Sequence, residues 1–180
     1  MVRYRAIFIG VLVIVLAFWL AQYAKDNESI RQVVSQYGYF GIFGIAIISG
    51  FNLAVPIPAI SFLPLFLESG LGTWSTILVV SLGVTLADMI AFFLGKAGRH
   101  VFPEGKIIKR IQKLGEKNVH SPILVLFLFA SFVPLPNEVL GLPMGFMGYN
   151  KWHVLTAVFL GNFVFNTLYG LGVVNIFNLL

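Results

Sequence analysis

Long apolar stretches, separated by short polar segments, dominate this sequence. Residues 6–24 form one uninterrupted apolar run, and residues 74–95 and 152–174 form two more that contain few polar side chains. A run of about 20 apolar residues is long enough to cross a bilayer as a helix. The pattern therefore predicts an all-α integral membrane protein. A cleaved signal peptide is the alternative for the first run, although the run is long for one and no clear cleavage site follows it.

Two further apolar segments are broken by pairs of prolines, and we expect each to form a re-entrant hairpin. Proline lacks the backbone donor that a helix needs, so the helical pieces beside each break are too short to span. Irregular backbone at membrane depth is tolerated only where it is buried in protein or lines a wet cavity. We expect the prolines at the breaks to have mainly a structural role, in which they create the ends of half-helices. They are Pro56, Pro58, Pro134 and Pro136.

The two broken segments repeat each other at a fixed spacing. Pro134 follows Pro56 by 78 residues (134 − 56), and both lie in the pattern Phe-x-x-x-Val-Pro-x-Pro. Such a match in prolines, glycines and tryptophan is rare by chance, so we predict a structural repeat of a hairpin followed by a spanning helix. The same spacing pairs Gly70 with Gly148, Trp74 with Trp152, Gly83 with Gly161, and Asp88 with Asn166.

Basic residues orient the predicted segments. Arg3, Arg5 and the basic loop at residues 96–121 belong in the cytoplasm by the positive-inside rule. The two hairpin units then enter from opposite faces, which is the inverted-topology repeat of many secondary transporters. We expect a multi-pass protein of the plasma or inner membrane with a cytoplasmic N-terminus. The predicted segments are an N-terminal span (1–25), an external connector (26–36), the first repeat (37–95), the basic cytoplasmic loop (96–121) and the second repeat (122–180).

The basic loop also carries apolar residues at helical spacing. Ile107, Ile108, Ile111 and Leu114 lie opposite its lysines and arginines. This pattern is typical of an amphipathic helix that lies on anionic headgroups. An ordinary cytoplasmic loop with the usual positive excess is an equally good interpretation.

Composition narrows the class of protein. Of the 180 residues, 58% are hydrophobic and 11% are charged, whereas a soluble domain carries about 25% charged residues. The net charge of +5 is concentrated in the basic loop, which argues against nucleic acid as a partner. There is no cysteine, the three histidines show no metal spacing, and no Ser–His pair or phosphate loop is present. We therefore expect no catalytic residue, no metal, no cofactor and no enzymatic activity.

Polar side chains within the apolar segments are the candidate functional residues. An ionisable residue inside a membrane is costly and marks function by default, so Asp88 and Glu138 are candidates for proton relay or headgroup contact. Alternatively, Asp88 lies near its helix end, and Glu138 caps a short helix, where negative charge is favoured. The other members of this predicted substrate or proton pathway are Asn52 and Asn137, which could instead satisfy freed backbone groups, and Asn162 and Asn166, which could bond between helices.

The order of hairpin, span, basic loop, hairpin and span, with Gly95-x-x-Gly98-Arg99 closing the first half, resembles the DedA family over about residues 35–175. This family is also called the VTT or SNARE-associated Golgi family. The resemblance implies a lipid scramblase or flippase, of the kind that recycles undecaprenyl phosphate, serves envelope homeostasis and in some members depends on the proton motive force. It also implies that Arg99 contacts a lipid phosphate, with a positive-inside anchor as the alternative.

The resemblance is to a divergent member. Bacterial members usually place arginines around the proline of the second hairpin and a glutamate in the first hairpin. Here those places hold Ser131, Asn137 and Asn52. These departures weaken the case for undecaprenyl phosphate as the particular substrate.

The predicted function is movement of a lipid or lipid phosphate across the bilayer by a transporter, scramblase or flippase. Membrane lipids are the expected partners, with protons as one option for a coupling ion. The alternatives are a small-solute or ion carrier and a non-transporting membrane scaffold. The sequence leaves open the substrate, its direction, the coupling ion, the oligomeric state and the depth of Asp88 and Glu138.

Overall fold

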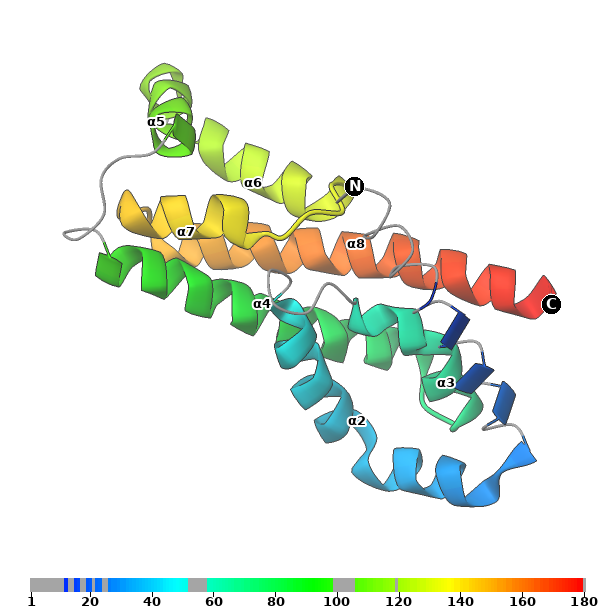
Figure 1. Ribbon diagram of the computed structural model, residues 1–180. Coiled ribbons are helices and arrows are strands. Elements are labelled where there is room, and N and C mark those ends of the chain that lie inside the picture. The colour runs from blue at the N-terminus through cyan, green and yellow to red at the C-terminus, as the bar shows by residue number, and fades with distance from the viewer. Residues whose placement is uncertain are drawn as a thin grey trace.

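Helices make up the parts of the chain that the structure describes (Figure 1). The structure is a computed structural model and describes residues 12, 15–16, 19–20, 22–23, 26–51, 58–98, 106–118 and 120–179. No strand occurs within these ranges, which confirms the all-α prediction for them. The elements are α2 (Glu28–Gly50), η1 (Ala59–Phe62), α3 (Leu63–Glu68), α4 (Thr73–Ala97), α5 (Lys106–Lys117), α6 (Ser121–Phe132), α7 (Glu138–Phe146) and α8 (Lys151–Leu179).

Three of these helices are long and apolar enough to cross a membrane. The candidate spans are Arg31–Gly50 in α2, Thr73–Ala97 in α4 and Lys151–Ile176 in α8. The spans in α4 and α8 coincide with the two predicted at residues 74–95 and 152–174. Large apolar side chains on both helices are exposed, as expected where lipid rather than water surrounds the protein.

Helix α2 is longer than the helical piece expected before the first proline break, in the repeat predicted to begin at residue 37. Residues 28–36, which were predicted to belong to a polar connector, continue the helix, because their Glu, Arg and Gln are good helix formers. At Gly38, φ is 49° and ψ is −140°, a conformation that glycine adopts at little cost, and the helix bends there. The prediction that this helical piece is too short to span was therefore wrong by length, since α2 holds a 20-residue candidate span.

Helices α4 and α8 form an antiparallel pair through the centre of the molecule (Figure 1). Their direction follows from two hydrogen bonds between them. Asn162 of α8 bonds Thr85 of α4, and Asn166 bonds Ser81. Residue numbers therefore fall along one helix as they rise along the other, and the polar faces of the two helices meet.

The shorter helices pack against this pair so that each long helix contacts a helix from the other half of the chain. Helix α2 packs on α4 with Gly83 against Ala46, and α6 packs on α8 with Gly161 against Ala130. Helix α7, however, packs mainly on α4, whereas η1 and α3 contact α8, where Gly170 meets their side chains. Each long helix therefore contacts both halves of the chain.

Glycines bring α4 and α7 into backbone contact. A Cβ atom added at Gly95 of α4 would clash with the carbonyl oxygen of Leu142, and one added at Gly145 of α7 would clash with that of Phe92. Small residues that let helix backbones approach closely are typical of membrane helix pairs. This contact anchors α7, which follows the second proline break, onto α4, the long helix of the first half.

Several local features recur at the predicted spacing of 78 residues. Helices α4 and α8 begin at residues 73 and 151, which differ by that number (151 − 73). The turns before them contain Gly70 with φ of 87° and Gly148 with φ of 75°. The backbone hydrogen bonds of these turns also match, since Gly70 donates to Leu67 as Gly148 donates to Gly145.

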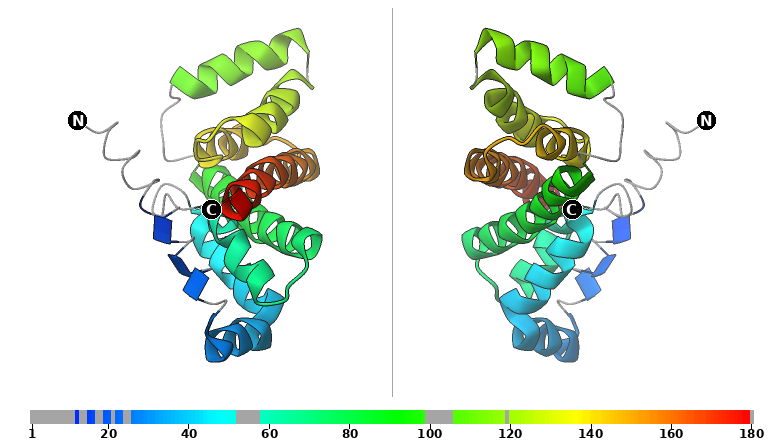
Figure 2. Two further views of the ribbon diagram at one scale, coloured as in Figure 1. Left: turned by 90° about the vertical axis from the view of Figure 1, so that its right-hand side faces the viewer. Right: turned by 90° about the vertical axis from the view of Figure 1, so that its left-hand side faces the viewer.

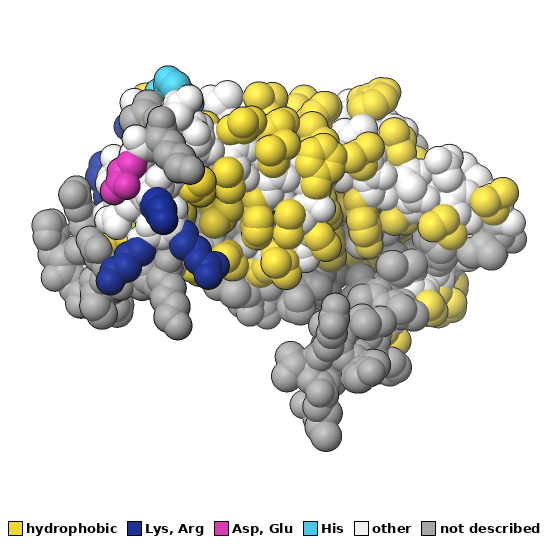
Figure 3. Space-filling view, turned by 90° about the horizontal axis from the view of Figure 1, so that it is seen from above, with side chains coloured by type: hydrophobic (Ala, Val, Ile, Leu, Met, Phe, Trp, Pro, Cys, Tyr) yellow, Lys and Arg dark blue, Asp and Glu magenta, His cyan; other side chains and the backbone are white. Residues whose placement is uncertain are grey.

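Helix α5 lies across one end of the bundle. Figure 2 shows α5 lengthwise in the views where α8 is seen nearly end-on. Ile108 and Ile111 are buried, while Ile107 and Leu114 are exposed. In Figure 3, lysines and arginines gather at this end, beside a broad apolar face that continues along the molecule. The predicted helix in the basic loop is thus present, and its orientation suits a membrane surface.

Four predictions fall on residues that the structure does not describe. Asn52, Pro56 and Arg99 lie outside the described residues, as does most of the N-terminal span predicted at residues 1–25. The predictions made for them stay predictions.

We predict that Gly95→Ala and Gly145→Ala each destabilise the protein by about 1–3 kcal/mol, the usual cost of overpacking. The added methyl group would meet the backbone of the facing helix, which has no freedom to move aside. The free energy of unfolding in mixed detergent micelles would measure the effect. Gly44→Ala is the matched control, because a Cβ atom there has nothing within 4 Å. Equal stability of all three variants would contradict the close α4–α7 contact.

Candidate functional site

Asp88 lies near the middle of α4, which spans residues 73–97 and has its midpoint at residue 85. At 1.5 Å per residue, the carboxyl group is only about 4.5 Å along the axis from that midpoint. The side chain is 3% exposed. The alternative in which Asp88 lies at a helix end is therefore excluded, and the protein must compensate for burying this group.

Two asparagine side chains supply that compensation. The Oδ2 atom of Asp88 accepts hydrogen bonds from Asn137 Nδ2 at 3.0 Å and from Asn162 Nδ2 at 2.9 Å. Asn137 also donates to Asn162 Oδ1 at 2.9 Å, and Asn162 donates to Thr85 at 3.1 Å. Asp88 thus ties α4 to α8 and to the break between α6 and α7.

A second hydrogen bond between α4 and α8 lies further along the same faces. Asn166 Nδ2 donates to the hydroxyl oxygen of Ser81 at 3.0 Å, and Ser81 in turn donates to the carbonyl of Ile77 at 2.7 Å. Neither Ser81 nor Thr85 was among the predicted site residues. Their spacing from Asp88, at positions 81, 85 and 88, is the signal that could have found them, because residues so spaced share one helix face.

Glu138 is the first residue of α7 and lies beside this cluster. Its side chain is buried, and it directly follows Asn137, which bonds Asp88. The first turn of a helix is a favourable place for a carboxylate, as the capping interpretation expected. In the part of the chain that the structure describes, however, Glu138 Oε2 and Asp88 Oδ1 are buried without a hydrogen-bond partner.

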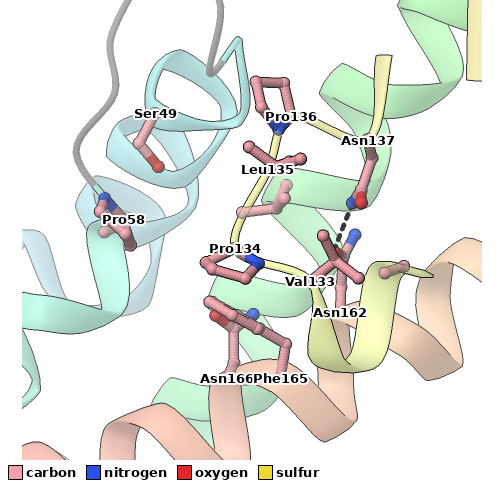
Figure 4. A pocket seen from close by; sticks show the side chains of 13 residues that line it. Ser49, Pro58, Val133, Pro134, Leu135, Pro136, Asn137, Asn162, Phe165 and Asn166 are labelled. Atoms are coloured by element: carbon pink, nitrogen blue, oxygen red, sulfur yellow. Dashed lines mark hydrogen bonds between the residues drawn. The ribbon is translucent and has the colours of Figure 1, made fainter. Parts of the chain in front are cut away.

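A cavity of about 150 Å³ adjoins the polar cluster. Figure 4 shows how the residues of both chain breaks converge on it. The first half of the chain contributes Ser49 and Pro58, and α8 contributes Asn162, Phe165 and Asn166. The second break supplies a continuous stretch of the wall, from Val133 through Pro134, Leu135 and Pro136 to Asn137.

The structure therefore brings most of the predicted site residues together. Asp88, Asn137, Asn162 and Asn166 form hydrogen-bonded contacts between elements, and Glu138 follows Asn137 directly. Pro58, Pro134 and Pro136 line the cavity, as expected of breaks that open a space between half-helices. Among the described residues, no group of three or more metal-ligating side chains occurs, and the cavity wall carries no Lys, Arg or His.

This arrangement provides polar contacts where a bilayer offers none. Asparagine and serine side chains line a space near the middle of two long apolar helices, and the Asp88 carboxyl group lies one hydrogen bond behind them. In hydrocarbon, a polar group without a hydrogen-bond partner costs roughly several kcal/mol. A polar ligand in the cavity would exchange its hydration for these side chains.

Comparison with known proteins gives one finding for this chain. The family model described as the VTT domain matches residues 55–174, which contain α4, α8 and the whole polar cluster. No curated protein and no solved structure gives a significant match.

We predict that Asp88→Ala and Asn137→Ala are energetically coupled by about 0.6–1.7 kcal/mol, the range for hydrogen bonds between membrane helices. Each change alone removes the bond between these side chains, so the double variant loses less than the sum. Unfolding of the four proteins in mixed micelles would give the coupling energy. The control cycle uses Asp88→Ala with Thr167→Val, because the Thr167 hydroxyl bonds Phe163 and shares no partner with Asp88. Equal coupling in both cycles would contradict the network.

Proposed function

Because this chain belongs to the VTT domain family, we propose that it is a membrane transporter, of the scramblase or flippase type, that moves a lipid or lipid phosphate across the bilayer. The observation that carries the proposal is the buried polar cluster beside a cavity, at the middle of α4 and α8. A lipid headgroup needs polar partners to cross hydrocarbon, while its acyl chains can stay in the membrane. The chain makes or breaks no covalent bond in this proposal.

We propose that the two halves form an inverted repeat with re-entrant hairpins, in which α2, although long enough to span, ends at Gly50 beside Val84 and Ala87 near the middle of α4. The recurring turn geometry at Gly70 and Gly148 supports a repeat, and so does the exchanged packing of α7 on α4 and of α3 on α8. In Figure 1 the arms of the two halves approach the centre from opposite ends of the α4–α8 pair. Such repeats place substrate sites near the midplane, between broken helices.

Asp88 and Glu138 are the proposed coupling groups. They are buried carboxyl groups, Glu138 directly follows the Asn137 that bonds Asp88, and each has one oxygen without a partner among the described residues. Uptake of a proton would remove one of the two charges and provide a donor for such an oxygen. Proton movement could thereby be linked to loading of the cavity, as carboxyl relays in membrane transporters allow.

The proposed location is the plasma or inner membrane, with α5 on the cytoplasmic side. Lys109, Arg110 and Lys113 of α5 are exposed at one end of the bundle, whereas Glu28 and Glu68 lie on elements at the opposite end. Positive residues favour the cytoplasmic face. An N-terminus on that side, with membrane lipids as the partners, completes the proposal.

Lipid movement in reconstituted liposomes tests the proposed function. An impermeant reductant destroys fluorescent lipid in the outer leaflet, so we expect wild-type protein to let it destroy well over half of the signal. Asp88→Asn should lower the initial rate by about tenfold, equivalent to ~1.4 kcal/mol of lost stabilisation, because the carboxyl group is the centre of the network. Thr167→Val, which lies off the cavity, should match wild type.

The outcomes separate the proposal from its alternatives. Loss of only the outer-leaflet half of the signal with wild-type protein would contradict lipid movement. Wild-type rates in Asp88→Asn would contradict a role for the cluster, as expected if the protein moves lipid along its surface.

Single introduced cysteines test the inverted arrangement, because the chain has no cysteine of its own. We expect Ser35→Cys and Ser75→Cys to react with an impermeant thiol reagent from one side of the membrane. His120→Cys and Lys151→Cys should react only from the other side, since these exposed residues lie at the opposite end of the bundle. Labelling of all four from the same side would show that the two halves are not inverted.

A further inference from the structure

We propose that the cavity binds a primary ammonium group, so that the lipid moved by this protein carries an amine in its headgroup; this inference rests on the proposed function. The chemistry of the wall points to it. Asparagine can present either a donor or an acceptor to a ligand, and the partners of its other atom decide which.

The orientation of Asn166 follows from Ser81. The hydroxyl of Ser81 uses its single hydrogen to bond the Ile77 carbonyl at 2.7 Å. Its oxygen can therefore only accept from Asn166, which must turn Nδ2 toward Ser81. The acceptor Oδ1 of Asn166 remains for the cavity, together with the one Nδ2 hydrogen that Ser81 does not use.

Asp88 fixes the other two amides in the same sense. The Oδ2 atom of Asp88 accepts from both amides, so Asn137 and Asn162 both turn Nδ2 toward Asp88. Asn162 Oδ1 is then used by Asn137. At Asn137, the atom that remains for a ligand is an oxygen.

The rest of the wall adds acceptors and no positive charge. Ser49 donates its hydroxyl hydrogen to the Ala46 carbonyl at 3.2 Å and so presents oxygen lone pairs. No Lys, Arg or His lines the cavity among the described residues. The residues of the first break at positions 52–57, whatever their placement, include no charged side chain.

Two carboxyl groups stand behind this acceptor wall. Asp88 is one hydrogen bond away from the cavity-lining Asn137 and Asn162. Glu138 is adjacent to Asn137, and each carboxyl group keeps one buried oxygen without a partner in the described chain. An anionic phosphate at the same place would find no cationic side chain and only one spare side-chain N–H, at Asn166, whereas an ammonium group supplies three donors for these oxygens and a positive charge beside the carboxyl groups.

The shape of a lipid fits this polarity. In an aminophospholipid the ammonium group is the outermost part of the headgroup, beyond the phosphate and the acyl chains. With the ammonium group in the cavity, the phosphate lies toward the cavity mouth and the acyl chains stay in hydrocarbon.

The test compares lipids that carry the same fluorescent acyl chain and differ only in headgroup. In phosphatidylcholine liposomes with wild-type protein, we expect labelled phosphatidylethanolamine to cross at least about threefold faster than labelled phosphatidylglycerol. Asn166→Leu removes one wall acceptor without touching Asp88, so it should bring the ratio close to one. Thr167→Val, the neighbouring residue off the cavity, should keep the wild-type ratio.

The outcomes distinguish this inference from the proposed function. Equal rates for both headgroups, with well over half of the signal lost, would overturn the ammonium site and leave lipid movement standing. If no lipid moves, the proposed function falls, and binding then decides the site. Short-chain phosphatidylethanolamine should raise the unfolding temperature of the detergent-solubilised protein more than short-chain phosphatidylglycerol does, and Asn166→Leu should abolish the difference. No difference in the wild-type protein would overturn the site.

A free amine could offer the same chemistry as a lipid amine. Ethanolamine at millimolar concentration on both sides of the membrane separates the two sources. Unchanged movement of labelled phosphatidylethanolamine supports a site that only a membrane-anchored amine occupies. Inhibition of this lipid alone, with phosphatidylglycerol unaffected, supports the ammonium site and identifies free amines as a second ligand. Equal inhibition of both lipids would contradict recognition of the ammonium group.

Discussion

The arrangement depends on one constraint: a carboxyl group in the middle of an apolar helix needs partners that lipid does not provide. Asp88 finds them in Asn162 of α8 and in Asn137 at the start of α7. Those two bonds set the rotation of the antiparallel α4–α8 pair and bring the second chain break against it. The close backbone contacts at Gly95 and Gly145 then hold α7 in the position that lets Asn137 reach the carboxyl group.

The same constraint explains why the chain breaks lie where they do. Prolines end the half-helices and free backbone groups at membrane depth, which is tolerable only beside protein or a polar cavity. The second break lines the cavity from Val133 to Asn137, and Pro58 brings the end of the first break to it. A continuous helix at the second break would fill this space and separate Asn137 from Asp88. The second break therefore helps to form the cavity and completes the network beside it.

Much of this could be predicted from sequence, because periodicity and proline are local. The spans of α4 and α8, the second break and the polar residues Asp88, Asn162 and Asn166 follow from composition and spacing alone. The length of α2 did not follow from composition and spacing, because a polar segment beside a glycine is compatible with either a loop or a bent helix. The packing of α7 on α4 and the bonds of Ser81 and Thr85 also escaped, because they depend on how distant helices rotate against each other.

The sequence-based candidates and the observed network differ most in what they imply about charge. A list of polar residues in apolar segments treats Asp88, Glu138 and the asparagines as interchangeable partners for any headgroup. Their hydrogen bonds give them a direction: Ser81 and Asp88 draw the amide donors inward, so oxygen atoms remain for the cavity. The residues that orient the wall asparagines are thus Ser81 and Asp88, which belong to α4 and do not themselves line the cavity. Selectivity for a donor cation would then be a property of the α4 face, even though α4 itself supplies only Val84 to the lining.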